Sequence, residues 1–337
     1  PLKDYSEFGF EQMAESDRVR LEEKKKIRKA SNLVGIVYII VWFLPSVLAT
    51  GLMDLTKIIF GGSVGGELLG DPAYLLFLQT VLSIAMFTAP FLIIPLRTGK
   101  KRVQLMSLEK PRRELFLPLV LVGVGVSAFA NIATSTVSSI FSGFGIEFLA
   151  PKIDYPSGFF GLIISVLAVA VTPALVEEFS MRGMVMGHLR EFGDDFAIFV
   201  SAAVFAMIHG NLVQIPFAFI MGLIIGYAVV KTGSLITGIA IHFINNFASV
   251  ILDMIVEGTS STFVKISITA VYFAVCFLCG FIGLFLAKKY KSDLWEMDKT
   301  ESKLSLGQKI GYFFSSPAII VAIGTAVVDS LQMIYIS

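Results

Sequence analysis

Charged residues are unusually few in this sequence. Only 16% of its 337 residues are Asp, Glu, Lys or Arg, whereas 55% are apolar; a soluble domain usually carries about 25% charged residues. This shortage excludes an ordinary water-soluble domain and predicts a polytopic membrane protein. The net charge of +1 points to no partner by itself, and we expect no nucleic-acid ligand.

Cysteine is almost absent as well. The two cysteines, Cys276 and Cys279, lie three positions apart within an apolar run. A CxxC redox site would need an exposed thiolate, so this position favours a buried, inert pair. Disulfide bonds are therefore not expected to stabilise the fold.

Long apolar runs, by contrast, fill most of the chain. A membrane-spanning helix needs about 20 apolar residues, and eight segments before Tyr290 have or approach this length. We therefore predict an all-α transmembrane helical bundle of about eight spans. A ninth candidate contains Pro317 and Asp329, which mark it as a candidate re-entrant segment. The predicted segments are 33–53, 73–96, 115–141, 158–188, 195–212, 214–231, 234–256, 264–288 and 310–336.

Basic residues are concentrated on one side of such a bundle. Lys24–Lys29 precedes the first span, and the loops 97–114 and 288–291 are also basic. The loops on the other side are acidic or nearly neutral, namely 54–72, 142–157 and 257–263. Because positive charge marks the cytoplasmic side, this pattern places the N-terminus in the cytoplasm. We expect a multi-pass protein of a bacterial plasma membrane, with any cavity reachable from the cytoplasm.

One apolar segment carries charge at membrane depth, where ionisable groups are costly and usually functional. In Val171–Gly183 (VTPALVEEFSMRG), two adjacent glutamates point about 100° apart on a helix. Glu178 can pair with Arg182 at i,i+4, which leaves Glu177 free to face the bundle interior. Pro173 favours a kink four residues before Glu177, and a kink leaves space for water or substrate.

Two further segments bring polar side chains to a similar depth. FAMIH places Phe205 and His209 on one helix face, and HFINN does the same for His242 and Asn246. At about 1.5 Å per residue, the two histidines, the asparagine and Glu177 all lie roughly 12–21 Å from the basic ends of their helices. Because packing residues need not coincide in depth, we predict that these groups form one intramembrane site.

Two chemistries suit this set of residues. An apolar cleft favours the neutral form of a carboxyl group, which suits a general base working near neutral pH. A histidine can then help to hold the water, and a second histidine with an asparagine can stabilise an oxyanion. Alternatively, Glu177, His209 and His242 are a zinc-ligand set that leaves a position for water. HExxH does not occur in the sequence, so a metal site would need ligands from three helices.

The three motifs resemble those of a known family. EEFSMR (177–182), FAMIH (205–209) and HFINN (242–246) follow the patterns EExxxR, FxxxH and HxxxN/D of the CAAX protease and bacteriocin-processing enzymes, called CPBP or Abi proteins. Phe179 and Gly183 fit this pattern too. The resemblance covers about residues 170–250, and the motifs are specific only in combination.

The resemblance implies an intramembrane endopeptidase with an all-helical core. Its eukaryotic members remove the last three residues of prenylated CAAX proteins, and bacterial relatives are linked to peptide maturation and bacteriocin immunity. By this resemblance, Glu177 and His209 activate water. His242 and Asn246 then stabilise the oxyanion. The predicted site residues are Glu177, Glu178, Arg182, His209, His242 and Asn246.

Composition, together with this resemblance for the core, suggests a division of the chain and a set of partners. We expect a charged cytoplasmic segment, N-terminal transmembrane helices, a CPBP-like catalytic core, and C-terminal helices with a basic loop, at 1–32, 33–157, 158–256 and 257–337. The expected partners are a hydrophobic or lipidated peptide and the lipid bilayer. We expect no cofactor, with zinc as the alternative. A non-catalytic immunity factor or scaffold, and a proton-relaying transporter, are the competing functions.

Overall fold

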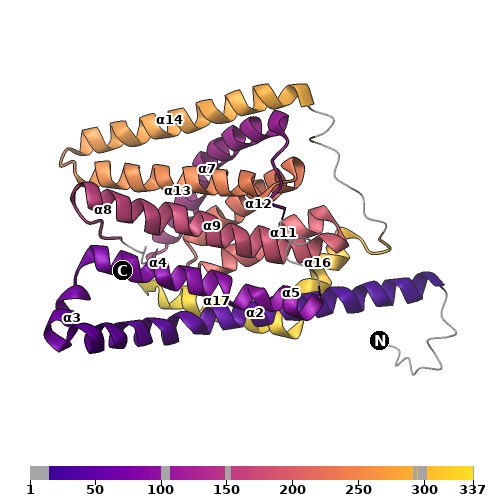
Figure 1. The fold of residues 1–337 in the computed structure, drawn as a ribbon. Helices are drawn as coiled ribbons and strands as arrows, with labels where there is room; N and C mark the ends of the chain where they lie inside the picture. Colours follow the sequence, from indigo (N-terminus) through magenta and orange to yellow (C-terminus); the bar gives the residue numbers. More distant parts are fainter. Residues whose placement is uncertain (1–14, 100–106, 149–152, 291–293, 295–301, 337) are drawn as a thin grey trace.

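The computed structural model describes residues 15–99, 107–148, 153–290, 294 and 302–336. These residues form an all-α bundle of long helices that lie roughly side by side (Figure 1), which confirms the predicted class. The helices are α2 (Glu15–Phe60), α3 (Gly62–Leu68), α4 (Pro72–Thr88), α5 (Ile93–Thr98), α7 (Arg113–Ser142), α8 (Gly158–Ser165), α9 (Thr172–Glu178), α10 (Gly187–Leu189), α11 (Asp194–Ile208), α12 (Gln214–Thr232), α13 (Leu235–Glu257), α14 (Thr262–Ala287), α16 (Leu306–Phe314) and α17 (Pro317–Gln332).

The number of membrane-length segments agrees with the predicted total of about eight. Within the described residues, seven helical segments are long and apolar enough to cross a membrane, and α16 with α17 makes an eighth if this pair, bent by 72°, is one span. One predicted span is wrong in length. Segment 195–212 is the 15-residue helix α11, about 22 Å long. Gly210, with a φ of +59°, turns the chain directly after His209 and ends this helix early.

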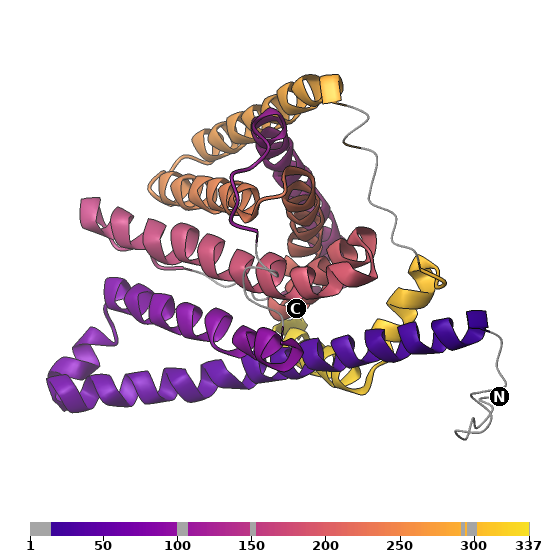
Figure 2. The ribbon, with the colours of Figure 1, turned by 45° about the vertical axis from the view of Figure 1, so that its right-hand side comes forward.

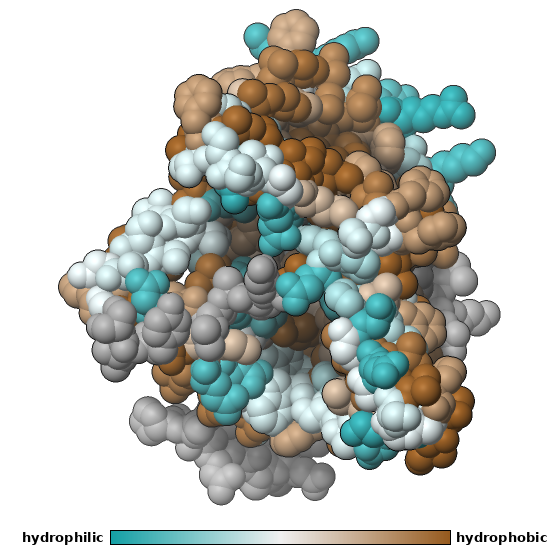
Figure 3. Space-filling model, turned by 90° about the vertical axis from the view of Figure 1, so that its left-hand side faces the viewer, coloured by the Kyte–Doolittle hydropathy of each residue, from teal (hydrophilic) through white to brown (hydrophobic). Residues whose placement is uncertain are grey.

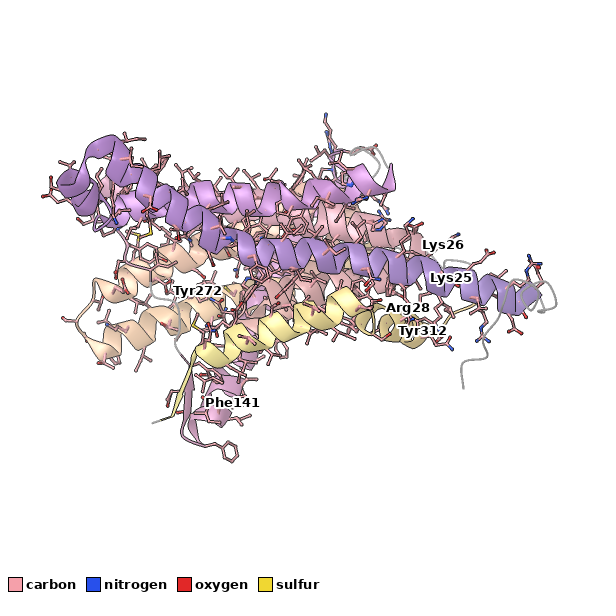
Figure 4. All side chains as sticks on the ribbon, turned by 90° about the horizontal axis from the view of Figure 1, so that it is seen from below. Lys25, Lys26, Arg28, Phe141, Tyr272 and Tyr312 are labelled. Carbon is pink, nitrogen blue, oxygen red and sulfur yellow. The ribbon has the colours of Figure 1, made fainter. Side chains whose placement is uncertain are left out.

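Residues 15–32 of the charged N-terminal segment and the first predicted span form one helix. α2 has 46 residues, about 69 Å at 1.5 Å per residue, whereas a bilayer core is about 30 Å thick. The boundary predicted at residue 32 is therefore a change of composition within a continuous helix. Lys26 and Arg28 of α2 lie at the same end of the molecule as Tyr312 of α16 (Figure 4), and Lys24 Nζ lies 4.9 Å from the centre of the Tyr312 ring.

The bundle has two chemically different ends. Lys26, Arg97 and His188 line one cavity, so α2, α5 and α10 meet at what we name the basic end. At the opposite, acidic end, the Tyr155 hydroxyl lies 3.5 Å from Asp253 Oδ2 at the end of α13. Burial and the neighbouring Asp253 raise the pKa of Tyr155 to about 12, so this hydroxyl stays protonated and donates.

Two groups of helices enclose the segment that runs from α8 to α10. Figure 2 shows α2 with α4 on one side of this segment, and α13 with α14 on the other. α4 and α13 both contact α9 directly. The segment with the two glutamates is therefore the central helix of the bundle, and its side chains reach partners on several neighbours.

The C-terminal segment joins both ends of the molecule. α16 lies at the basic end, where Lys309 Nζ donates to the Phe192 carbonyl at 2.6 Å. α17 then packs against α2 so closely that a Cβ at Gly35 would lie 2.7 Å from the Ala318 carbonyl carbon. Beyond α17, strand β2 (Ile334–Ile336) pairs antiparallel with β1 (Ile146–Phe148). The bend before Pro317 lets one segment serve both ends.

Candidate active site

Three helices bring the predicted polar groups to one cavity. Glu177 comes from α9, His209 from the turn after α11, and His242 with Asn246 from α13. All four line a cavity of about 200 Å³. The convergence predicted from residue depth is therefore found in the structure. The apolar part of the wall includes Phe205, Phe217, Met221 and Ile225.

The central helix is not regular around the glutamates. π-helical turns at Val166–Val171 and Phe179–Met186 flank the short α-helix α9, and such turns are frequent at functional sites. Pro173, at the start of α9, has no N–H to give to the Val169 carbonyl four residues earlier. That carbonyl accepts a hydrogen bond from Asn246 Nδ2 at 3.0 Å instead. This hydrogen bond docks α13 onto the central helix at the irregular turn beside Pro173.

Glu178 and Arg182 form the ion pair that their spacing predicts. Arg182 Nη1 donates to Glu178 Oε1 at 2.8 Å, and both side chains are fully buried. The same oxygen also accepts a hydrogen bond from His242 Nδ1 at 2.9 Å. A carboxylate that holds one ring nitrogen fixes the orientation and tautomer of a histidine. The sequence did not reveal this second partner, which links Glu178 to the site.

Close packing holds this buried chain of polar groups in place. Arg182 Nη2 lies 3.3 Å from the Gly222 carbonyl of α12, and its guanidinium carbon is 4.7 Å from the centre of the Phe205 ring. The centre of the same ring is 4.8 Å from that of His209 and 6.1 Å from that of His242. Phe205, which the sequence placed only on the face of His209, therefore lies between the arginine and both histidines.

Glu177 makes none of the short hydrogen bonds that hold Glu178 to Arg182 and His242. Its side chain is 15% exposed, and His242 Nε2 lies 3.8 Å from its Oε2, which is too long for a direct hydrogen bond. His209 Nδ1 lies 2.8 Å from the Phe205 carbonyl; because a carbonyl only accepts, this nitrogen donates. In neutral His209 the other ring nitrogen then carries a lone pair, so the cavity holds two bases.

Two polar cavity residues escaped the sequence argument. Asn245 lines the cavity and donates through Nδ2 to Asn246 Oδ1 at 3.0 Å. Its own Oδ1 is buried and has no hydrogen-bond partner among the described residues. The sequence could have predicted Asn245 as a site residue, because it follows His242 by three positions and i,i+3 residues also share a helix face. Gln79 of α4 lines the cavity too, and nothing in its local sequence distinguishes it.

The zinc alternative requires three ligands around one point. Within the described part of the chain, no group of three or more His, Cys, Asp and Glu side chains is placed to hold a metal ion. As arranged in the described part of the chain, Glu177, His209 and His242 do not form the three-ligand set that a zinc ion needs.

Part of the cavity lining extends toward the acidic end. Every described residue from Ser180 to Met186, on the basic side of Glu177, is buried. Lining residues such as Gln79 and Val169 instead lie within about 17 Å of the acidic ends of their helices, counted at 1.5 Å per residue. Figure 3 faces that end and shows hydrophilic side chains around a hollow near its middle. Access from the basic side stays a prediction; on that side of Glu177 the central helix itself is tightly packed.

A family comparison agrees with the motifs. Residues 159–248 match a family model described as type II CAAX prenyl endopeptidase Rce1-like. The match runs from α8 to α13 and includes all of the predicted site residues. It confirms the resemblance to the CAAX protease family for this part of the chain and supports a membrane peptidase. No curated protein and no solved structure matches the chain.

Proposed function

We propose that this protein is an intramembrane endopeptidase that cleaves a hydrophobic, lipidated or membrane-associated peptide with an activated water molecule. The observation that carries the proposal is the convergence of Glu177, His209 and His242 from three helices on one cavity. The family match over residues 159–248 supports the reaction class. A scaffold would not require three ionisable groups at this depth, where each is costly.

In the proposed reaction, Glu177 is the general base. Its carboxylate takes a proton from water while the water oxygen bonds to the carbonyl carbon of the substrate. The lone pair of His209 accepts the second water proton in a hydrogen bond and orients the attack, since its other nitrogen is held by Phe205. A positioned base of this kind contributes about 10²–10⁴-fold to rate.

His242 is proposed to stabilise the oxyanion. In its protonated form, Nδ1 donates to Glu178 and Nε2–H is left to donate to the developing oxygen charge. Glu177, which lies 3.8 Å from this nitrogen, then returns its proton to the leaving amine as the carbon–nitrogen bond breaks. Asn246 has one amide hydrogen on the Val169 carbonyl, so its contribution is mainly to position the helices.

We further propose that the reaction needs no metal ion and that the basic end faces the cytoplasm. The ligand geometry described above and the positive charge of the basic loops support these two points. Purified protein should therefore keep its peptidase activity after dialysis against chelators. Stoichiometric zinc that is lost together with activity, and restored together with it, would overturn the first point.

The central test is peptide cleavage by the full-length protein in nanodiscs. Hydrophobic and prenylated peptides are incubated in ¹⁸O-labelled water, and new termini are identified by mass spectrometry. Glu177→Gln should abolish cleavage and ¹⁸O incorporation. Glu257→Gln, which removes a carboxylate from the exposed end of α13, is the matched control and should cleave normally. Undiminished cleavage by Glu177→Gln would refute the assignment of the base.

A further inference from the structure

A second cavity lies on the other side of His209. It has a volume of about 560 Å³ and is lined by residues of α2, the turn after α11, and α17. His209 lines both this cavity and the one that contains Glu177. The walls contributed by α2 and α17 lie outside residues 159–248, so the family match does not account for them. A volume of this size lies within the roughly 300–1,000 Å³ of typical ligand sites.

The chemistry of this cavity is acidic and aromatic. Asp329 of α17 contributes a carboxylate, and Trp42 of α2 donates its indole N–H to Asp329 Oδ2. Tyr38 and Phe43 add two more aromatic rings to the walls. Among the described residues, neither the cavity lining nor the ion pairs include a lysine or arginine beside Asp329. A carboxylate within a membrane-spanning bundle is costly unless a cation accompanies it.

The contacts of α2 and α17 fix this carboxylate next to the turn that carries His209. The Tyr38 hydroxyl donates to the Met207 carbonyl at 2.9 Å, and the Ser330 hydroxyl donates to the Gly210 carbonyl at 3.3 Å. A Cβ built at Gly210 would lie 3.2 Å from Asp329 Oδ2. A group bound by Asp329 would therefore lie beside the reacting histidine and not at a remote surface.

We propose that this cavity is a substrate subsite that binds an ammonium or guanidinium group of the peptide, with Asp329 as the counter-charge. Carboxylates pair with such cations, and aromatic faces attract them. The cation is a lysine or arginine side chain close to the cleaved bond, or the free amino group of a peptide. The position of this subsite beside the reacting bond rests on the proposed peptidase function.

Binding can be tested without cleavage. The full-length Glu177→Gln protein carries Trp295→Phe, which leaves Trp42 as the single tryptophan, and its fluorescence is titrated in nanodiscs. The probes are hydrophobic peptides that differ at one position, acetylated with lysine or acetylated with norleucine, and a norleucine peptide with a free amino terminus. We expect at least one cationic probe to bind about tenfold more tightly than acetylated norleucine, equivalent to about 1.4 kcal/mol.

The variants separate the charge from the fold. Asp329→Asn should reduce the cationic preference to near unity, and Asp329→Glu should keep most of it. Gln332→Lys places a cation in the same cavity wall without touching Asp329 and should also abolish the preference. Asp54→Asn, an exposed carboxylate of α2, is the matched control. The proposal is overturned if no cationic probe is preferred, or if Asp329→Asn and Gln332→Lys keep the preference.

A parallel cleavage experiment with the same peptides and the wild-type protein separates the two proposals. A cationic preference in binding without any cleavage would support the subsite and contradict the peptidase function. Cleavage of all three probes at equal rates, with equal binding, would support the peptidase and contradict the subsite. The difference between the acetylated lysine probe and the free amino-terminal probe identifies which cation is recognised.

Discussion

Replacing each of the two adjacent glutamates with glutamine should impair different properties. Glu178→Gln should lower the free energy of unfolding, whereas Glu177→Gln should lower the cleavage rate. Glu178 is fully buried, and its Oε1 accepts hydrogen bonds from Arg182 and His242 at 2.8 and 2.9 Å. Glu178→Gln removes the negative charge and leaves the arginine buried without it. Breaking a buried ion pair from one side costs about 3–5 kcal/mol. We expect this variant to lose that much stability.

Glu177→Gln removes a charge that no neighbour depends on for stability. The side chain is partly exposed, and its nearest cationic partner, His242, is 3.8 Å away. A volume-conserving change at such a position should alter the free energy of unfolding by less than about 1 kcal/mol. Activity should fall by about 10²–10⁴-fold, because the general base is lost.

The assay is SDS-driven unfolding in mixed micelles, followed by circular dichroism, beside peptide cleavage in nanodiscs. The double variant Glu178→Gln/Arg182→Met removes both buried charges and should recover at least about 2 kcal/mol relative to Glu178→Gln alone. Its activity should remain low, since His242 loses its carboxylate. Equal stability losses in the two single glutamine variants would refute the division of roles between the glutamates.

Three other outcomes follow from the contacts of α13 and from the ligand geometry. Gly238→Ala should lower the cleavage rate at least tenfold, because its Cβ would lie 2.9 Å from Glu178 Oε2. The control Gly324→Ala should leave cleavage unchanged, because its Cβ would meet no atom within 4 Å. Equal effects of the two variants would contradict this reasoning. Asn246→Ala should lose about 1–3 kcal/mol in the same unfolding assay, since the Val169 carbonyl loses its donor. A Pro173→Ala change that restores the missing N–H should recover part of that loss, and its failure to do so would show that the proline and asparagine are independent. Exhaustive chelation should leave the cleavage rate within about twofold, as measured beside the metal content of the sample.

The length and number of the helices could be read largely from the sequence. Apolar runs of about 20 residues predict membrane-length helices because a bilayer sets that length, and the helix bounds follow most of the predicted segments. One exception was α11, which ends at Ile208, whereas the predicted segment runs to residue 212. Gly210 ends the helix there through a positive φ, and a hydropathy pattern does not report backbone dihedrals.

The sequence alone also determined the Glu178–Arg182 pair and the common depth of Glu177, His209 and His242, because helical periodicity and rise fix both. Only the tertiary structure showed that Glu178 also holds His242, and that Asn246 docks on the Val169 carbonyl of the central helix. It also placed Asp329, from the far end of the chain, beside His209. These contacts depend on how each helix is rotated against its neighbours, and that rotation is set by the packing of all their side chains together.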